Sequence, residues 1–326
     1  MLIQVAFRKR SAMFMGLNVS FPLFLDKTIQ AITLLLEQES LDKKIQKKVF
    51  HNKMLGGSFE TCGFIRNNRK VFDICLSTMA GCPMGCKMCA TNYSDKPYER
   101  ILTSEEMLAQ IYIMIKKIPL DLLIEPNFVV GFMGNGEPFL NLQNIIKVIK
   151  YIEETSPNLI KKYNISTLGI NLHKIDEIAK LSNTIKKDIK LQYSLISINS
   201  KNRRKLLPRA TPFKQAIPYL DQYAKLTGIP IKYNVPLIKT VNNSIDDFKL
   251  IANFILENQS YRVLKISSYN SSPQCPYIGC SDNEIYNAIS YFNSQGIKPK
   301  LFLGDRNQEI HATCGLMRIH TQIKEI

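Results

Sequence analysis

From residue 71 onward, short runs of β-branched and aromatic residues alternate with amphipathic stretches, and this alternation limits the possible folds more than any other feature of the chain. Six strand-like runs are each followed by a stretch with helical spacing. Such a repeat predicts an α/β fold with a parallel sheet, either curled into a partial barrel or laid open. The strands are predicted at 71–77, 128–132, 164–167, 191–195, 231–237 and 263–268, the helices at 104–116, 142–154, 174–181, 212–226, 244–256 and 282–292, and an edge strand at 298–303.

Polar residues mark the positions where several of the predicted helices begin. Thr103 and Glu106 have the spacing of a capping box. Ser244 and Asp282 are predicted as N-caps. In parallel sheets of this kind the functional groups lie at the carboxyl ends of the strands, so the motifs that follow are expected there.

Residues 1–56 are predicted to form a short helical accessory segment, separate from a main domain over residues 57–326. Ile29, Ile32, Leu35 and Leu36 have helical apolar spacing, and a lysine-rich stretch follows at 43–48. Two consecutive glycines at positions 56 and 57 mark the boundary.

The charge of the chain is strongly positive, with 43 Lys and Arg against 27 Asp and Glu and a formal net charge of +16. This excess favours nucleic acid or an anionic membrane face as a partner, although a merely solvated basic surface gives the same count. Residues 201–214 contain no acidic side chain and suit RNA phosphates. No apolar run reaches the roughly 18 residues of a membrane helix, and the N-terminal charges follow the apolar residues, so we expect a cytoplasmic protein without a membrane segment.

Five of the eight cysteines lie between positions 62 and 89, which favours a metal or redox site over a set of disulfides. Cys82, Cys86 and Cys89 follow the first predicted strand at spacings of four and three residues. Three thiolates can hold a 4Fe–4S cluster and leave one iron open for a substrate or cofactor. A zinc site with Cys75 or Cys314 as the fourth ligand is the alternative.

A glycine-rich segment, residues 134–138 with the sequence Gly-Asn-Gly-Glu-Pro, follows the second predicted strand. Glycine allows the backbone to approach a ligand closely, and a carboxylate can pair with an ammonium group. This segment therefore predicts a ligand site beside the three cysteines.

Taken together, these motifs resemble the RlmN/Cfr family of radical S-adenosylmethionine (SAM) RNA methyltransferases, and the similarity runs from about Glu60 to Met317. The fold that the resemblance implies is a partial (β/α)6 radical SAM barrel. The matching segments occur in the family's order and are residues 75–82, the three-cysteine loop, 98–103, 136–141, 166–169, 241–244 and 309–315.

The resemblance implies an activity: methylation of C2, or less readily C8, of an adenosine in 23S rRNA, tRNA or both. A first SAM would methylate Cys314, and a radical made from a second SAM would take a hydrogen from that methyl group. The methyl carbon then adds to the adenine ring, Glu60 removes the ring proton, and a transient disulfide between Cys75 and Cys314 releases the product.

The resemblance also implies the cofactors and partners. Cys82, Cys86 and Cys89 would hold the 4Fe–4S cluster, and an electron donor such as flavodoxin or ferredoxin would reduce it. The expected protein is a monomer that binds RNA and no membrane. SAM contacts are implied for a glycine–glutamate pair and for three polar residues that close the third, fourth and sixth strands: Gly136, Glu137, Ser166, Ser194 and Asn270.

The chain departs from the family at three places. Ile196 stands where the family has a histidine that contributes to the SAM pocket, Leu316 and Met317 replace a Gln-Leu pair, and the N-terminal accessory domain is shortened. Two other functions therefore stay open: a radical SAM enzyme with a changed, non-rRNA substrate, and a non-catalytic paralogue that binds RNA or ribosomes.

Overall fold

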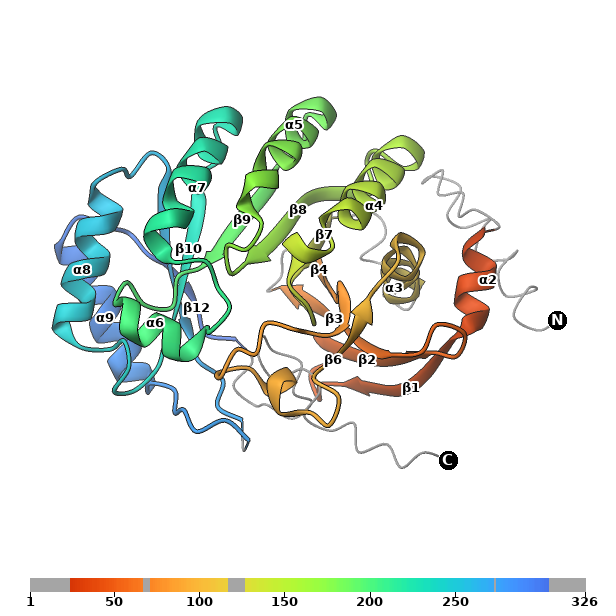
Figure 1. Ribbon diagram of the computed structural model, residues 1–326, viewed down its shortest axis with the longest axis horizontal. Coiled ribbons are helices and arrows are strands. Elements are labelled where there is room, and N and C mark those ends of the chain that lie inside the picture. The colour runs from red at the N-terminus through yellow and green to blue at the C-terminus, as the bar shows by residue number, and fades with distance from the viewer. Residues whose placement is uncertain (1–23, 67–70, 117–126, 273, 305–326) are drawn as a thin grey trace.

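The protein is described by a computed structural model that covers residues 24–66, 71–116, 127–272 and 274–304. In these residues ten strands form one continuous sheet in the order β1-β2-β3-β4-β7-β8-β9-β10-β11-β12 (Figure 1). Neighbouring strands are antiparallel from β1 to β4 and parallel from β4 to β12. A separate antiparallel pair, β5 and β6, follows β4. The strands are β1 (Ile32–Glu39), β2 (Ile45–Asn52), β3 (Ser58–Arg66), β4 (Val71–Leu76), β5 (Met79–Gly81), β6 (Tyr98–Ile101), β7 (Asn127–Phe132), β8 (Ile160–Thr167), β9 (Ile189–Ser194), β10 (Ile231–Leu237), β11 (Arg262–Ser268) and β12 (Lys300–Phe302).

Helices follow the parallel strands and lie along one face of the sheet (Figure 1). None of the described helices is both long and apolar enough to cross a membrane. The helices are α2 (Phe24–Ala31), α3 (Ser104–Lys116), α4 (Leu142–Thr155), α5 (Ile175–Ile185), α6 (Ser200–Leu206), α7 (Phe213–Thr227), α8 (Ile245–Leu256) and α9 (Asp282–Ser294), with short 3-10 turns at Ala90–Tyr93, Pro138–Leu140 and Leu172–Lys174.

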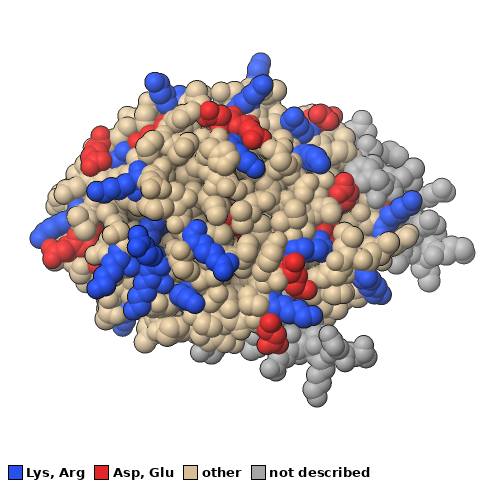
Figure 2. Space-filling model, viewed as in Figure 1, with Lys and Arg blue, Asp and Glu red and all other residues tan. Residues whose placement is uncertain are grey.

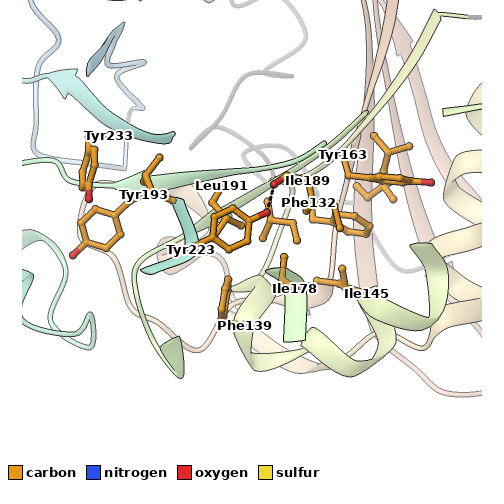
Figure 3. Close-up of a cluster of buried hydrophobic side chains, with 14 of the residues drawn as sticks. Phe132, Phe139, Ile145, Tyr163, Ile178, Ile189, Leu191, Tyr193, Tyr223 and Tyr233 are labelled. Atoms are coloured by element: carbon orange, nitrogen blue, oxygen red, sulfur yellow. Dashed lines mark hydrogen bonds between the residues drawn. The ribbon is translucent and has the colours of Figure 1, made fainter. Parts of the chain in front are cut away.

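The core lies between the sheet and these helices (Figure 3). Alternate residues of each strand point into it, because successive side chains of a strand face opposite sides. Tyr163, Tyr193 and Tyr233 come from three neighbouring strands and are fully buried. Tyr223 of α7 donates a hydrogen bond to the Ile189 carbonyl, which ties the helix layer to the sheet. The opposite side of the sheet, called the inner face below, carries the intervening residues, many of them polar.

The parallel part of the fold agrees with the prediction. Each predicted strand from residue 71 onward corresponds to an observed parallel strand, and the α/β fold class is confirmed. Thr103 and Glu106 form the expected capping box: the Glu106 amide donates to Thr103 Oγ1 (3.2 Å) and the Thr103 amide donates to Glu106 Oε2 (2.9 Å). Ser244 caps α8 as predicted. The prediction of Asp282 as a cap is wrong, because Ser281 caps α9.

The prediction for the N-terminal segment requires correction, because the part of residues 1–56 that the structure describes is mostly strand. The helix ends at Ala31, and β1 begins at Ile32. Lys47 and Lys48 of the lysine-rich stretch lie in β2, which pairs with both β1 and β3. The two glycines occupy a turn with φ of +69° and +84° between β2 and β3, so the sheet continues across the expected boundary. Short apolar runs fit both helix and strand, and here the pairing partner decides.

Candidate active site

The carboxyl ends of the parallel strands gather most of the residues singled out in the sequence. The glycine-rich loop follows β7. Ser166 is the next-to-last residue of β8, and Ser194 is the last residue of β9. Asn270 comes two residues after the end of β11. Parallel strands end at one edge of a sheet, so these groups share one end of the fold, as expected for an α/β enzyme.

The two glycines of the loop are required by close packing against the chain that follows β4. A Cβ on Gly134 would lie 2.6 Å from the Ser77 amide nitrogen and 2.7 Å from Leu76 backbone atoms. Gly136 has φ of +111°, and a Cβ there would lie 2.5 Å from Thr78 Oγ1. Both positions therefore exclude a side chain, and the backbone of the loop is held against residues 76–79.

Asn135 is a site residue that the sequence interpretation did not single out. Its carbonyl accepts hydrogen bonds from the Thr78 and Met79 amides at 2.8 and 3.2 Å, and its amide donates to Ser77 Oγ at 2.9 Å. Its side chain donates to Thr91 Oγ1 at 3.0 Å, just after the last of the three cysteines. Asn135 therefore joins the glycine-rich loop to the cysteine loop.

Glu137 is buried and makes its contacts with the neighbouring strand end. It accepts hydrogen bonds from Thr167 Oγ1 at 2.6 Å and from the Leu168 amide at 3.0 Å. Burial raises the pKa of Glu137 to about 7, against the lowering effect of these hydrogen bonds. The carboxylate thus holds the ends of β7 and β8 together at the place where the resemblance puts the SAM amino group.

The loop with Cys82, Cys86 and Cys89 is attached to distant parts of the chain at several points. The Lys87 amide donates to the Leu206 carbonyl at 2.8 Å. The Tyr269 hydroxyl donates to the Met88 carbonyl at 2.9 Å. These bonds fix the loop between α6 and the end of β11.

The surroundings of two thiols in this loop disfavour their charged form. Burial, with smaller contributions from Cys89 and Glu137, raises the pKa of Cys82 to about 12. Burial, Cys89 and Cys82 also raise the pKa of Cys86. Thiolates in such surroundings need a bound cation to offset their charge, which an iron–sulfur cluster supplies.

Three cysteine thiolates can hold a 4Fe–4S cluster and leave one iron open for a further ligand. Among the described residues, no three His, Cys, Asp or Glu side chains are grouped as for one metal ion. The three cysteines are partly exposed, which leaves room for the cluster at the end of the sheet.

The other predicted SAM contacts lie at the strand ends with various partners. Ser166 Oγ accepts a hydrogen bond from Gln192 at 3.3 Å on the inner face. The Ser194 carbonyl accepts from the Arg203 guanidinium at 2.6 Å. Asn270 is buried, with its side-chain oxygen 3.6 Å from the position a Cβ would take on Gly304.

Arg203 belongs to the basic run but is not available to RNA, because it is buried under the site. Besides the Ser194 carbonyl, its guanidinium binds the carbonyls of Leu195 and Leu168 and the Tyr193 hydroxyl. Lys201, Arg204 and Lys205 of the same helix are exposed or half-exposed, and Figure 2 shows basic side chains gathered over α6. The run therefore divides into one structural arginine and a basic surface.

Ile196, at the position of the family's histidine, has a backbone conformation that isoleucine rarely adopts. Its φ is +58°, in the left-handed region, and its side chain is buried beside Tyr269 and Leu206. Asn242 holds this turn by donating to the Ile196 carbonyl at 2.7 Å. The side chain thus packs in an apolar cluster under the cysteine loop, where the family's imidazole would be polar.

Glu60 and Cys75 come together on the antiparallel side of the site. Glu60 lies on β3 and Cys75 on β4, and both are buried. Ser77 Oγ donates to the Glu60 carbonyl at 2.5 Å and accepts from the Asn135 amide, so a single hydroxyl connects Glu60 with the glycine-rich loop. The Glu60 carboxylate forms an ion pair with Lys47 of β2 at 3.3 Å. Cys314 lies outside the described residues.

Cys62 is a second residue that the sequence interpretation did not single out. It lies directly opposite Cys75 in the antiparallel register, and both sulfur-bearing residues pack in one buried cluster with Ile45, Phe64 and Met133. Directly opposite residues of antiparallel strands have Cα atoms about 4.5–5.5 Å apart, within the range of a disulfide. An added oxidant could therefore join the two thiols as a disulfide.

Comparison with known proteins fits this geometry. Residues 76–255, more than half of the chain, match the family model of the radical SAM superfamily. The chain belongs to the radical SAM superfamily. Its cofactors are accordingly a 4Fe–4S cluster and SAM, and the cysteine loop and strand-end residues described above provide a site that suits them.

Among curated proteins, the chain is 33% identical over 186 residues to a probable dual-specificity RNA methyltransferase RlmN of Pelodictyon phaeoclathratiforme, with 55% of this chain and 50% of that protein covered. A protein of the same name from Dictyoglomus turgidum is 29% identical over 267 residues, with 81% and 73% covered. The matched part thus spans between half and three quarters of these relatives. The predicted resemblance to the RlmN/Cfr family is confirmed by these matches.

A similar fold is found in the crystal structure of a radical SAM methyltransferase from Sphaerobacter thermophilus. The TM-score is 0.78 at 24% sequence identity, with 91% of this chain and 86% of that chain covered. At this identity the match shows the fold, which includes the partial barrel and extends through most of the described chain.

Proposed function

We propose that this protein is a radical SAM methyltransferase that acts on C2 of an adenosine in RNA, with C8 as the alternative position. The observation that carries the proposal is the Ser77 hydroxyl, which binds both the Glu60 carbonyl and the loop that follows β7. It brings a buried carboxylate to the end of the sheet where SAM would lie. Support also comes from the two relatives whose names state an RNA methyltransferase activity.

Three cysteines, Cys82, Cys86 and Cys89, would hold the cluster, and an electron carrier of the flavodoxin or ferredoxin type would reduce it. When bound, the cluster supplies the electron that cleaves SAM. The contribution of the chain is to position SAM: the backbone of Gly134 and Gly136 allows close approach, while Glu137, Ser166, Ser194 and Asn270 surround the carboxyl ends of the strands.

Cys314 is the proposed methyl carrier. Its thiolate attacks the SAM methyl group, and the sulfonium leaves as a thioether, S-adenosylhomocysteine. After the methyl carbon has been transferred to the base, the Cys75 thiolate attacks the Cys314 sulfur, forms a disulfide and releases the methylated nucleotide. Cys75 is paired with Gly131 of β7 and packs against Cys62 and Met133.

Glu60 is the proposed proton acceptor for the adenine ring proton. The ion pair with Lys47 places a positive charge beside the carboxylate, and both side chains are buried. A carboxylate held in a dry site by a single cation can accept a proton without first losing a shell of water.

Mass spectrometry of the tryptic peptide that carries Cys314 tests this proposal most directly. Cluster-loaded protein incubated with SAM is expected to yield that peptide with one added methyl group. An unmodified peptide from protein that cleaves SAM would exclude the methyl-carrier scheme. Methylated adenosine in rRNA or tRNA digests would identify the substrate, whereas SAM cleavage that does not depend on RNA would favour a changed substrate.

Cys75→Ala provides the second test. If Cys75 resolves the adduct, this variant accumulates RNA covalently attached to the protein, which is visible as a gel shift that ribonuclease removes. Normal product release by Cys75→Ala would remove Cys75 from the mechanism. A chain that binds RNA, loads the cluster and yet shows neither SAM cleavage nor adduct would be a non-catalytic paralogue.

A further inference from the structure

The inner face of the sheet carries a row of five lysines, one on each of five neighbouring strands. The pairing register places them all on this face. Lys265 lies directly opposite Lys300, Lys232 opposite Gln192, and Gln192 is two residues from Lys190 on the same strand. The members, in strand order from β8 to β12, are Lys162, Lys190, Lys232, Lys265 and Lys300.

Few acidic groups face this lysine row among the described residues. Asp73 forms an ion pair with Arg66 beside Lys162, and Asp188 pairs with Lys190 at 3.2 Å. Lys265 donates to the amide oxygen of Gln192 at 3.0 Å, a neutral partner. The positive charge of the row therefore exceeds the negative charge around it.

Repulsion within the row is visible at its centre. Burial and the charges of Lys265, Lys300, Lys162 and Lys190 lower the pKa of Lys232 to about 8. Like charges placed opposite each other on neighbouring strands destabilise a sheet. A bound anion would offset this repulsion, which a solvated surface lysine does not need.

The position of the row separates it from the proposed catalytic site. Lys190 and Lys232 are the second residues of β9 and β10, so they lie toward the amino ends of the strands. The glycine-rich loop, Ser194 and Asn270 lie at the carboxyl ends. A ligand on the lysine row would therefore lie toward the amino ends of the strands, away from the reacting groups at the carboxyl ends.

The spacing of the row suits an extended polyanion. Neighbouring strands are about 4.8 Å apart, so five successive lysines extend over roughly 19 Å. Phe302 lies at the β12 end with 39% of its surface exposed and the Lys265 ammonium 4.5 Å from its ring centre. A lysine row that ends at an exposed aromatic ring combines phosphate contacts with a surface on which a base can stack.

We propose that the lysine row binds a single-stranded RNA segment through its phosphates, apart from the nucleotide that reacts. The choice of RNA over another phosphate polyanion rests on the proposed function. The inference that the row binds an anion rests on the strand register and on the charges around the five lysines.

The test is a comparison of two triple variants of the full chain in RNA binding. Lys162→Gln, Lys232→Gln and Lys300→Gln remove three charges from the row and leave the contacts of Lys190 and Lys265 intact. The control removes the same charge from the helix-covered side through three exposed lysines of α4, α5 and α7: Lys150→Gln, Lys180→Gln and Lys225→Gln.

Fluorescence anisotropy with a labelled single-stranded RNA, measured over a range of salt concentrations, gives the readout. The row variant is expected to bind tenfold or more weakly than the control, with a salt slope lower by about 2, because about 0.7 counterion is released per phosphate contact. Equal affinity and slope in the two variants would overturn the proposal. Tripolyphosphate serves as a second probe: loss of its binding with RNA binding unchanged would overturn the choice of RNA.

Thermal unfolding shows whether the variants fold and adds an independent readout. Lys232→Gln alone, and the row variant, should melt at a higher temperature than the wild type in low salt, because repulsion is removed. RNA binding needs neither cluster nor SAM. Loss of RNA binding in the row variant together with an unmodified Cys314 peptide would therefore contradict the proposed function and leave the lysine row standing.

Discussion

Strands β1 to β3 and strands β7 to β12 belong to one sheet but supply different kinds of functional group. In the parallel part, the groups lie at strand ends and in the glycine-rich and cysteine-rich loops. In the antiparallel part, Lys47, Glu60 and Cys62 lie within strands, buried and fixed by the pairing. Under the proposed function, cofactor binding would fall to the strand ends and proton transfer to a residue within the sheet.

The largest expected effect removes a cluster ligand from the parallel part. Cys82→Ala should abolish the iron–sulfur absorbance of the reconstituted protein together with SAM cleavage, because two thiolates cannot hold the cluster. Cys280→Ala, a buried cysteine outside the loop, is the control and should retain both. A Cys82→Ala protein with full iron content would place the cluster elsewhere.

The next effect concerns the antiparallel part. Glu60→Gln should lower the rate of RNA methylation by about 10²–10⁴-fold, the usual effect of losing a general base. Methylation of Cys314 should continue, and covalent protein–RNA adduct should accumulate. The control is Glu37→Gln, which affects the ion pair of the neighbouring lysine, Lys48, on β2. If Glu60→Gln forms product at the wild-type rate, Glu60 is not the proton acceptor, and the acceptor would lie in the parallel part.

A third prediction compares a tightly packed glycine, Gly134, with a glycine in open space, Gly228. Gly134→Ala should destabilise the protein by about 1–3 kcal/mol and impair SAM binding, because its Cβ would lie 2.6 Å from the backbone at Ser77. At Gly228, which ends α7 with φ of +69° and no atom near its Cβ position, alanine should cost about 1–2 kcal/mol from backbone strain and leave SAM binding unchanged. Denaturant unfolding and SAM titration measure the two effects.

Glu137 makes the stability of the parallel part depend on pH. Burial raises its pKa to about 7, above the value of the unfolded chain, so the native state binds more protons than the unfolded state between pH 4.5 and 7. Stability therefore falls as the pH rises through this range, by roughly 3 kcal/mol at most. Denaturant unfolding of cluster-free protein should show the fall, and Glu137→Gln should remove it. A wild-type profile that rises over the same range would contradict this assignment.

The smallest expected effect is the change in stability when a cysteine of β3 is linked to a cysteine of β4, where the antiparallel and parallel parts meet. Treatment of Cys314→Ala protein with diamide should join Cys62 and Cys75 as a disulfide, with two electrons and two protons passing to the diamide. Non-reducing peptide mapping detects the link, and unfolding in its presence should show little loss of stability, since the two residues are already directly opposite. Continued alkylation of both thiols after oxidation would rule the pairing out.

The sequence predicted the parallel part well because each of its elements carries a local signal. The 71–77, 231–237 and 263–268 runs are β-branched and bounded by polar residues, and Thr103 with Glu106 has an unmistakable capping pattern. The antiparallel part lacks such a signal. The apolar residues between Ile32 and Leu36 fit both the helical and the strand periodicity. Only pairing with β2 decides in favour of a strand.

The site was predicted where residues are close in sequence and missed where register creates the contact. The glycine and cysteine segments are each continuous, whereas Cys62 meets Cys75 only through strand pairing. The lysine row draws on five strands spread from Lys162 to Lys300, so no window of the sequence contains it. Ile196 was expected to change the SAM pocket, but its left-handed backbone could not be inferred from an isoleucine.

The hydrogen bonds of the cysteine loop join it to parts of the chain that are synthesised much later. Met88 receives its bond from Tyr269, 181 residues further along. A ribosome that has released only the first half of the barrel exposes three reactive thiols before their final support exists. The hydrogen-bonded form of this loop is therefore complete only after β11 has been synthesised.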